Sequence, residues 1–154
     1  MKKIGKNILK VLGCTVVCLS LFVAGLSIYN HIKVNGDINA IKDKGYYNPV
    51  SVGDYSLNLL KFGNENGSHK IVALAGFGVG DSSVSMREMT AELENDNQII
   101  FLDRAGYGAS DDTKADMNVK TIVADYQTAL KNANVEAPYT LMAHSIAGVM
   151  LLIG

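Results

Sequence analysis

A chain of 154 residues, with 48% hydrophobic and 19% charged side chains, is long enough for one folded domain. Its formal net charge is −1, and residues 30–154, with ten Lys and Arg against 15 Asp and Glu, carry −5. This charge argues against a nucleic-acid partner, which needs a basic surface. The two cysteines, Cys14 and Cys18, lie in an apolar N-terminal run, so the remainder offers no cysteine for a disulfide, a metal or catalysis.

Val11 to Tyr29 is a run of 19 residues without a charge, and a helix of this length can cross a hydrocarbon core of ~30 Å. Four lysines precede the run, and positively charged flanks stay on the cytoplasmic side. We therefore predict a cytoplasmic basic tail over 1–10 and a transmembrane signal-anchor helix over 11–29. The chain would then be a single-pass protein of the cell membrane with its C-terminal domain outside the cytoplasm.

A cleaved signal peptide is the alternative interpretation of the same run. The apolar core of a signal peptide is usually shorter, about 7–15 residues, and ends at small residues. Phe22-Val23-Ala24 is a poor cleavage site, and apolar residues continue to Tyr29. The sequence therefore favours the uncleaved anchor.

Residues 30–48 are mixed and polar and predict a short stalk, and residues 49–154 predict the N-terminal part of a folded domain. Strands and helices alternate along this second part, which predicts an α/β fold with a mostly parallel sheet and right-handed crossovers. In chain order we expect a strand–turn–strand unit over 49–62, a loop over 63–68, a buried strand over 70–75, a glycine-rich turn over 76–81, a helix over 85–94, a buried strand over 98–102, a long amphipathic helix over 117–134, a buried strand over 139–143 and a helix over 146–153.

Ser145 follows the last predicted strand directly and precedes a helix. A serine in this position sits on a sharp turn that pushes its hydroxyl out above the sheet edge and strains its backbone. Ala143 and Ala147, two residues to either side, are small, as close packing of strand and helix requires. The simpler interpretation is a serine that caps a helix N-terminus.

Two glycine-rich loops follow the earlier strands. The first holds Gly76 and Gly78 on either side of Phe77, where glycine lets the backbone approach a ligand closely. The second runs from Asp103 to Asp111 and holds Gly106 and Gly108. We expect the carboxylates of this second loop to bind backbone N–H groups rather than to take part in catalysis.

This order of motifs resembles the α/β-hydrolase fold family in its serine-hydrolase branch. The resemblance rests on Ala-Gly-Phe-Gly after one strand, Asp-Arg-Ala-Gly-Tyr-Gly-Ala-Ser-Asp after the next, a long helix, and then His-Ser-Ile-Ala-Gly, and it covers about 50–154. It implies that Ser145 is the nucleophile and that the N–H groups of Phe77 and Ile146 form the oxyanion hole. It also implies a small acyl or ester substrate and no metal or organic cofactor. The sequence departs from the family at Ala75, where histidine is frequent, and at the alanines around the serine.

A serine hydroxyl needs an adjacent base, and the family places its acid and its histidine after the serine in the chain. None of the three histidines, His31, His69 and His144, has a position in the sequence that suits this base. We therefore expect little or no turnover from these 154 residues alone, as in a truncated product or a fragment. A non-catalytic, membrane-tethered remnant is one alternative.

A dinucleotide-binding domain is another alternative, because Gly76-Phe77-Gly78-Val79-Gly80 follows a strand and Asp103 ends the next one. Its fingerprint requires glycine at position 81, which is aspartate here. This interpretation also leaves the second glycine loop and the serine turn unexplained.

Overall fold

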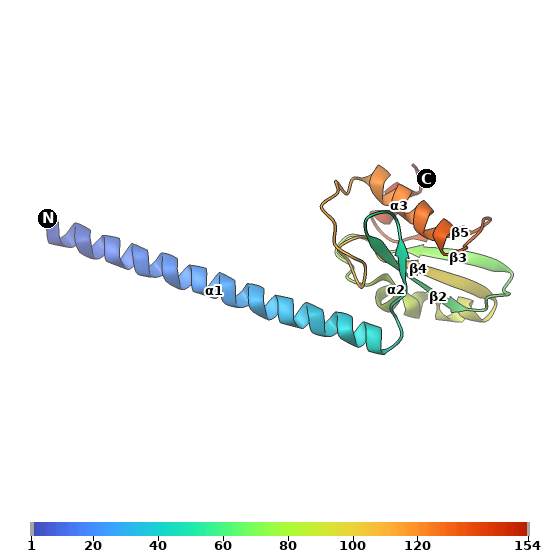
Figure 1. The fold of residues 1–154 in the computed structure, drawn as a ribbon, viewed down its shortest axis with the longest axis horizontal. Helices are drawn as coiled ribbons and strands as arrows, with labels where there is room; N and C mark the ends of the chain where they lie inside the picture. The colour runs from blue at the N-terminus through green and yellow to red at the C-terminus, as the bar shows by residue number, and fades with distance from the viewer. Residues whose placement is uncertain (1, 154) are drawn as a thin grey trace. The chain divides into compact units, whose positions relative to one another are not determined.

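The computed structural model describes residues 2–153, in two compact units that meet between Ala40 and Ile41. The N-terminal unit is formed by the helix α1 (Lys2–Asp43), whose last three residues, 41–43, belong to the second unit (Figure 1). From Lys10 onward this helix is long and apolar enough to cross a membrane. It does not end at Tyr29 but continues to Asp43, within the segment predicted as a stalk (30–48). Gly45 terminates the helix with a left-handed backbone (φ 76°). This turn lets the Tyr46 N–H donate to the Ile41 carbonyl in the last turn of the helix (3.0 Å).

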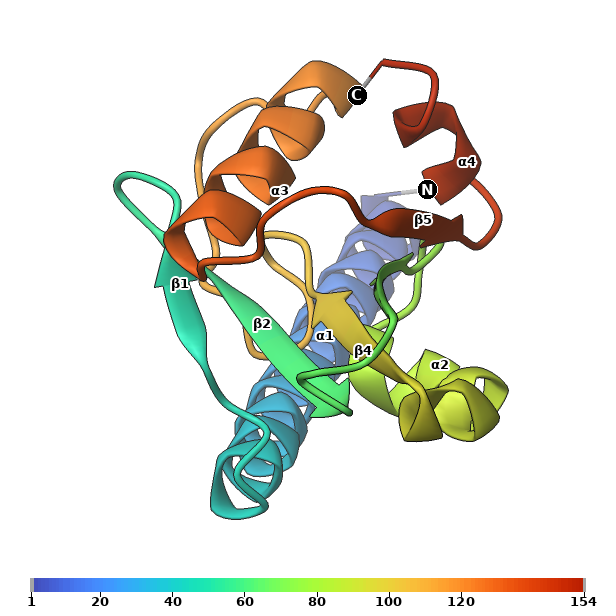
Figure 2. The same cartoon turned by 90° about the vertical axis from the view of Figure 1, so that its right-hand side faces the viewer.

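The second unit is built on a sheet with the strand order β1-β2-β4-β3-β5, of which Figure 2 labels β1, β2, β4 and β5. β3, β4 and β5 run parallel, and β2 runs antiparallel to both β1 and β4, so the sheet is mostly parallel as predicted. The strands are β1 (Pro49–Ser51), β2 (Ser56–Gly63), β3 (His69–Leu74), β4 (Asn97–Leu102) and β5 (Thr140–Ala143).

The helices of this unit are α2 (Ser82–Thr90), the 3₁₀ turn η1 (Ala91–Asn95), α3 (Val119–Asn132) and α4 (Ala147–Met150). The predicted helix over 85–94 begins three residues earlier, because the Asp81 carboxylate caps it by accepting from the Val84 N–H (2.8 Å). Its last residues tighten into η1. The predicted helix over 117–134 is present as α3, capped by Asn118, and the predicted helix over 146–153 is shorter.

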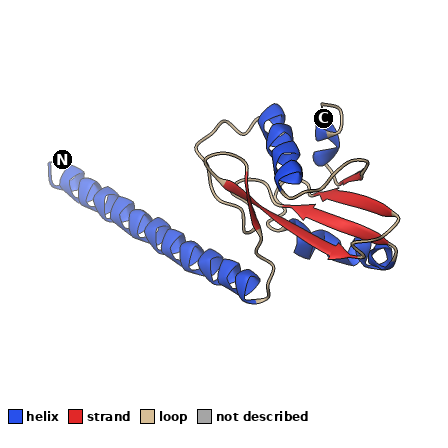
Figure 3. Cartoon of the chain, turned by 45° about the vertical axis from the view of Figure 1, so that its right-hand side comes forward, coloured by secondary structure: helices blue, strands red, loops and turns tan. Residues whose placement is uncertain are grey.

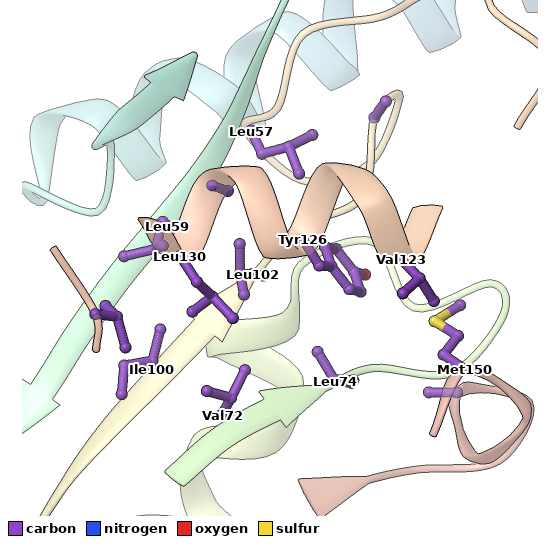
Figure 4. Packing of buried hydrophobic residues seen from close by; sticks show 14 residues of the cluster. Leu57, Leu59, Val72, Leu74, Ile100, Leu102, Val123, Tyr126, Leu130 and Met150 are labelled. Atoms are coloured by element: carbon purple, nitrogen blue, oxygen red, sulfur yellow. The ribbon is translucent and has the colours of Figure 1, made fainter. Parts of the chain in front are cut away.

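The two faces of the sheet are covered by different helices (Figure 3). Side chains alternate across a strand, so neighbouring residues of β3 and β4 face opposite layers. Val72 and Leu74 join the cluster beneath α3 and α4, whereas Ala73 packs with Met86 of α2. Figure 4 shows the larger cluster, in which Val123, Tyr126 and Leu130 of α3 lie over β2, β3 and β4. Helices on both faces explain why these strands are continuous apolar runs.

β5 differs from the buried strand that its sequence predicts. It pairs with β3 on one side only and forms an edge of the sheet as far as the chain is described. Thr140 and Leu141 are exposed, and only Met142 and Ala143 are half-buried. An apolar strand with one unpaired edge is a template for pairing with another strand.

Candidate active site

Ser145 occupies the turn between β5 and α4 and has a left-handed backbone, with φ 60°. A non-glycine residue in this region costs about 1–3 kcal/mol, so the surrounding structure must hold it there. Three backbone hydrogen bonds do so: His144 N–H to the Leu74 carbonyl (3.0 Å), Ala147 N–H to the His144 carbonyl (3.2 Å) and Gly148 N–H to the Ser145 carbonyl (3.0 Å). Ser145 itself is exposed, and Ala147 is fully buried.

The first glycine loop packs directly against this turn. Because β3 and β5 are parallel, with Leu74 opposite Ala143, the segments that follow them emerge at the same edge of the sheet. A Cβ on Gly76 would lie 2.9 Å from the Ser145 Cβ and 3.0 Å from the His144 Nδ1. Glycine is therefore required at 76 by the close approach of the serine turn.

Phe77 and Ile146, the predicted oxyanion-hole residues, line one cavity of about 250 Å³. In the hydrogen bonds among the described residues, neither of their backbone N–H groups has an acceptor. The Phe77 side chain is 76% exposed. The remaining lining of the cavity is mostly apolar and comes from the second glycine loop and from residues of α3, α4 and the segment before α3: Arg104, Ala105, Tyr107, Met117, Val119, Ile122 and Met150.

The carboxylate of Asp103 organises the loops around the turn. One oxygen accepts from the N–H (2.8 Å) and hydroxyl (2.7 Å) of Ser82, and the other accepts from Asn58 Nδ2 (3.1 Å) and the Ala109 N–H (3.4 Å). Asp111 accepts from a backbone N–H of β2. The prediction that both carboxylates bind backbone N–H groups is thus confirmed. The dinucleotide-binding alternative would need Asp103 to bind the ribose of the nucleotide, and it loses support because both oxygens of Asp103 are engaged inside the protein.

Burial raises the pKa of the Asp103 carboxyl above its ordinary 3.8, and the nearby Asp81 carboxylate raises it further. The hydrogen bonds from Ser82 and Asn58 act in the opposite direction, because they stabilise the charged form. Asp81 is also buried, and its Oδ2 has no hydrogen-bond partner among the described residues. The two acids therefore repel each other beneath the site.

The second glycine loop closes around the Asp103 carboxylate. Gly108, at φ 55°, has no room for a Cβ, which would collide with this carboxylate. Gly106, at φ 74°, donates its N–H to the Asp111 carbonyl (2.9 Å), which closes the loop. Gly78 also has positive φ, but open space surrounds it.

Sequence reasoning missed the role of Arg104. Its side chain is buried, and its Nη2 donates to the carbonyl of Gly76 at 2.9 Å. The two glycine loops are thereby joined. The Asp-Arg pair after a buried strand was visible in the sequence, but its partner lies 28 residues earlier and no local pattern identifies it.

Among the described residues, no histidine is hydrogen-bonded to Ser145. His31 lies in α1, where it pairs with Asn35 (3.1 Å). His69 begins β3, whereas Ser145 follows the other end of the neighbouring strand, and β3 spans about 16 Å from His69 to Leu74 at ~3.3 Å per residue. His144 is the neighbour of the serine and makes no hydrogen bond to it among the described residues, and its ring lies toward Gly76.

Comparison with curated proteins finds uncharacterised relatives. The chain is 30% identical over 150 residues to the uncharacterized protein YbdG of Bacillus subtilis (strain 168), and the match covers 97% of this chain and 45% of YbdG. It is 29% identical over 87 residues to a second uncharacterized protein of that organism, YqjL. The chain spans less than half the length of either relative. No family model matches the sequence.

Solved structures identify the fold. The proline iminopeptidase-related protein TTHA1809 from Thermus thermophilus superposes with a TM-score of 0.60 at 25% identity, over 69% of this chain and 38% of that one. An alpha/beta hydrolase fold protein from Burkholderia ambifaria gives 0.60 at 21% identity, over 70% and 37%. The lactone-degrading enzyme Est816 gives 0.59 at 19% identity, over 68% and 38%.

The mixed sheet, the helices on its two faces and these superpositions define the class. The chain is an α/β-hydrolase-fold protein, as the order of its sequence motifs predicts.

Replacing Gly76 by alanine should disturb the first glycine loop and the serine turn together. The new methyl group would meet the Ser145 Cβ at 2.9 Å, so we expect a loss of about 1–3 kcal/mol in the free energy of unfolding. Chemical denaturation of the chain in detergent measures it. Gly80→Ala in the same loop is the control, since a Cβ there meets nothing within 4 Å. Equal stability of the two variants would contradict the close packing.

Asp103 should make stability depend on pH. Its raised pKa means that the folded protein holds this proton more tightly than the unfolded chain. Its contribution to the free energy of unfolding is therefore largest below the ordinary pKa of 3.8 and falls as the pH rises through the higher folded value. Asp103→Asn should remove this part of the pH dependence, measured by urea unfolding from about pH 4 to about pH 7. Parallel pH profiles for the two proteins would refute the assignment.

Proposed function

We propose that this chain carries the nucleophile and oxyanion donors of a membrane-anchored serine hydrolase that acts on small acyl or ester substrates. Ser145 is the nucleophile, and the N–H groups of Phe77 and Ile146 stabilise the negative charge that develops on the substrate carbonyl oxygen. The observation that carries this proposal is the left-handed backbone of an exposed serine between a strand and a helix (φ 60°). Strained residues of this kind cluster at active sites and ligand-binding turns.

The surroundings of the serine support acyl transfer. Attack on a carbonyl needs donors without competing acceptors close to the nucleophile, and each such donor is worth about 2.7–4 kcal/mol in the transition state. The Phe77 and Ile146 N–H groups suit this need, because neither has an acceptor among the described residues. Ile146 directly follows Ser145, and Phe77 directly follows Gly76, which packs against the serine turn. The apolar lining beside them suits the acyl part of an ester. The lactone-degrading activity named for Est816 is chemistry of this kind.

Among the described residues, Ser145 has no hydrogen bond to a histidine or a carboxylate, so the proposal assigns these residues the nucleophile and the oxyanion donors alone. A serine without a base reacts slowly. We therefore expect the 154-residue polypeptide to show little steady ester hydrolysis and to respond to a base added from outside.

Labelling by a fluorophosphonate probe in the presence of imidazole tests the nucleophile. Imidazole supplies the missing general base, so labelling of Ser145, located by mass spectrometry, should rise with its concentration. Ser145→Ala should abolish the labelling. Ser85→Ala, which removes another exposed serine from α2, should leave it unchanged.

Failure to label at Ser145 at any imidazole concentration would favour the second candidate, a non-catalytic membrane-tethered remnant. Rapid turnover of an ester without imidazole, lost in Ser145→Ala, would instead show that a base is present within the chain. The two results contradict different parts of the proposal.

The apolar part of α1 is proposed to anchor the protein, with the second unit outside the cytoplasm. A single arginine at the centre of a membrane span costs about 2.5–3.5 kcal/mol. Leu21→Arg should therefore release much of the chain from the membrane fraction, whereas Val34→Arg, outside the uncharged run, should not. A C-terminal reporter that is active only outside the cytoplasm measures sidedness. Release of the unmodified chain by alkaline carbonate would argue against a spanning anchor.

A further inference from the structure

Arg104 contacts the backbone that presents one of the proposed oxyanion donors. Its guanidinium is buried, its Nη2 donates to the Gly76 carbonyl (2.9 Å), and its central carbon lies 4.5 Å from the centroid of the Tyr107 ring. The aromatic face and the carbonyl together fix the position of the cation. Arg104 also lines the cavity that Phe77 and Ile146 share.

The Gly76 carbonyl and the Phe77 N–H are the two ends of one peptide unit. A trans peptide is planar, so the direction of its C=O fixes the direction of its N–H, which points the opposite way. A charged donor on the oxygen also polarises the unit and makes the N–H a stronger donor. One hydrogen bond from Arg104 therefore sets both the direction and the strength of the Phe77 donor.

Little else holds this peptide. Among the described residues, the bond from Arg104 is the only hydrogen bond that reaches the backbone between Gly76 and Gly80. A Cβ built on Gly78 or Gly80 would meet nothing within 4 Å, and the Phe77 side chain is exposed. Without the arginine, no other hydrogen bond among the described residues would fix the orientation of the 76–77 peptide.

Given the proposed serine hydrolase, we propose that Arg104 is a positioning residue that holds the 76–77 peptide so that the Phe77 N–H faces the developing oxyanion. It touches neither the nucleophile nor the reacting carbonyl, and it acts through Gly76. A purely structural arginine would contribute to stability without affecting the rate of acylation at Ser145.

The hydrogen bond can be observed without any activity. Gly76-Phe77 is the one Gly-Phe pair in the 154 residues, so ¹³C-carbonyl glycine with ¹⁵N-phenylalanine yields a single linked resonance. In the full chain in detergent, Arg104→Met should shift this resonance in both the carbonyl and the amide dimensions. Arg87→Met is the matched control, because the hydrogen bonds of Arg87 go to Glu94 and Tyr46 and none of them reaches the loop. It should leave the resonance in place.

The effect on chemistry is measured by imidazole-dependent fluorophosphonate labelling of Ser145. Complete loss of an oxyanion donor lowers kcat by about 10²–10³, so a misdirected donor should lower the limiting rate of labelling by about tenfold to a hundredfold. The probe concentration at half-maximal rate should not change, because the donor acts on the transition state. Arg104→Lys keeps the charge and one donor and should recover part of the rate.

Three results would overturn the proposal. The resonance could stay in place in Arg104→Met; it could move while the limiting rate matches that of Arg87→Met; or the unmodified chain could fail to label at Ser145. The last result would remove the serine hydrolase as well, whereas the first two leave it intact. Should Arg104→Met fail to fold, the same comparison between Arg104→Lys and Arg87→Lys decides the question.

Discussion

The close approach of two loops at one sheet edge is the constraint on which the candidate site depends. Ser145 holds a left-handed backbone, and the loop after β3 lies so near that Gly76 has no room for a side chain. Parallel pairing of β3 with β5 creates this approach, because parallel strands end at the same edge. The hydrogen bonds of the turn and the packing of buried Ala147 keep Ser145 in this strained backbone conformation.

Beneath the turn, buried charged side chains hold the loops together, whereas apolar packing holds the elements together elsewhere in the unit. The Asp103 carboxylate ties β2, the start of α2 and the second glycine loop together, and Arg104 joins that loop to the first one. Burying a carboxylate beside Asp81 carries an electrostatic cost, seen in the raised pKa of Asp103. Several hydrogen bonds offset that cost and make the loops rigid, which is what a preorganised site requires.

The apolar layers between the sheet and its helices explain how the second unit can support the candidate site. α3 covers one face through Val123, Tyr126 and Leu130, and α2 covers the other through Met86. The central strands are thereby shielded from water on both faces, and their ends hold the loops that follow them in fixed positions. β5, at the edge, is the least covered of the parallel strands, although it carries the serine turn.

Periodicity and local motifs in the sequence determined the strand and helix order, the parallel sheet and the position of the serine turn, because these depend on neighbours a few residues apart. Local signals set the ends of helices less well, as α2 shows, where Asp81 extends the helix by capping it. Only the tertiary structure decided which carbonyl Arg104 binds, which partners the two oxygens of Asp103 have and which residues of β5 are covered. Each of these depends on residues distant in the chain, which the paired strands bring together and no local pattern encodes.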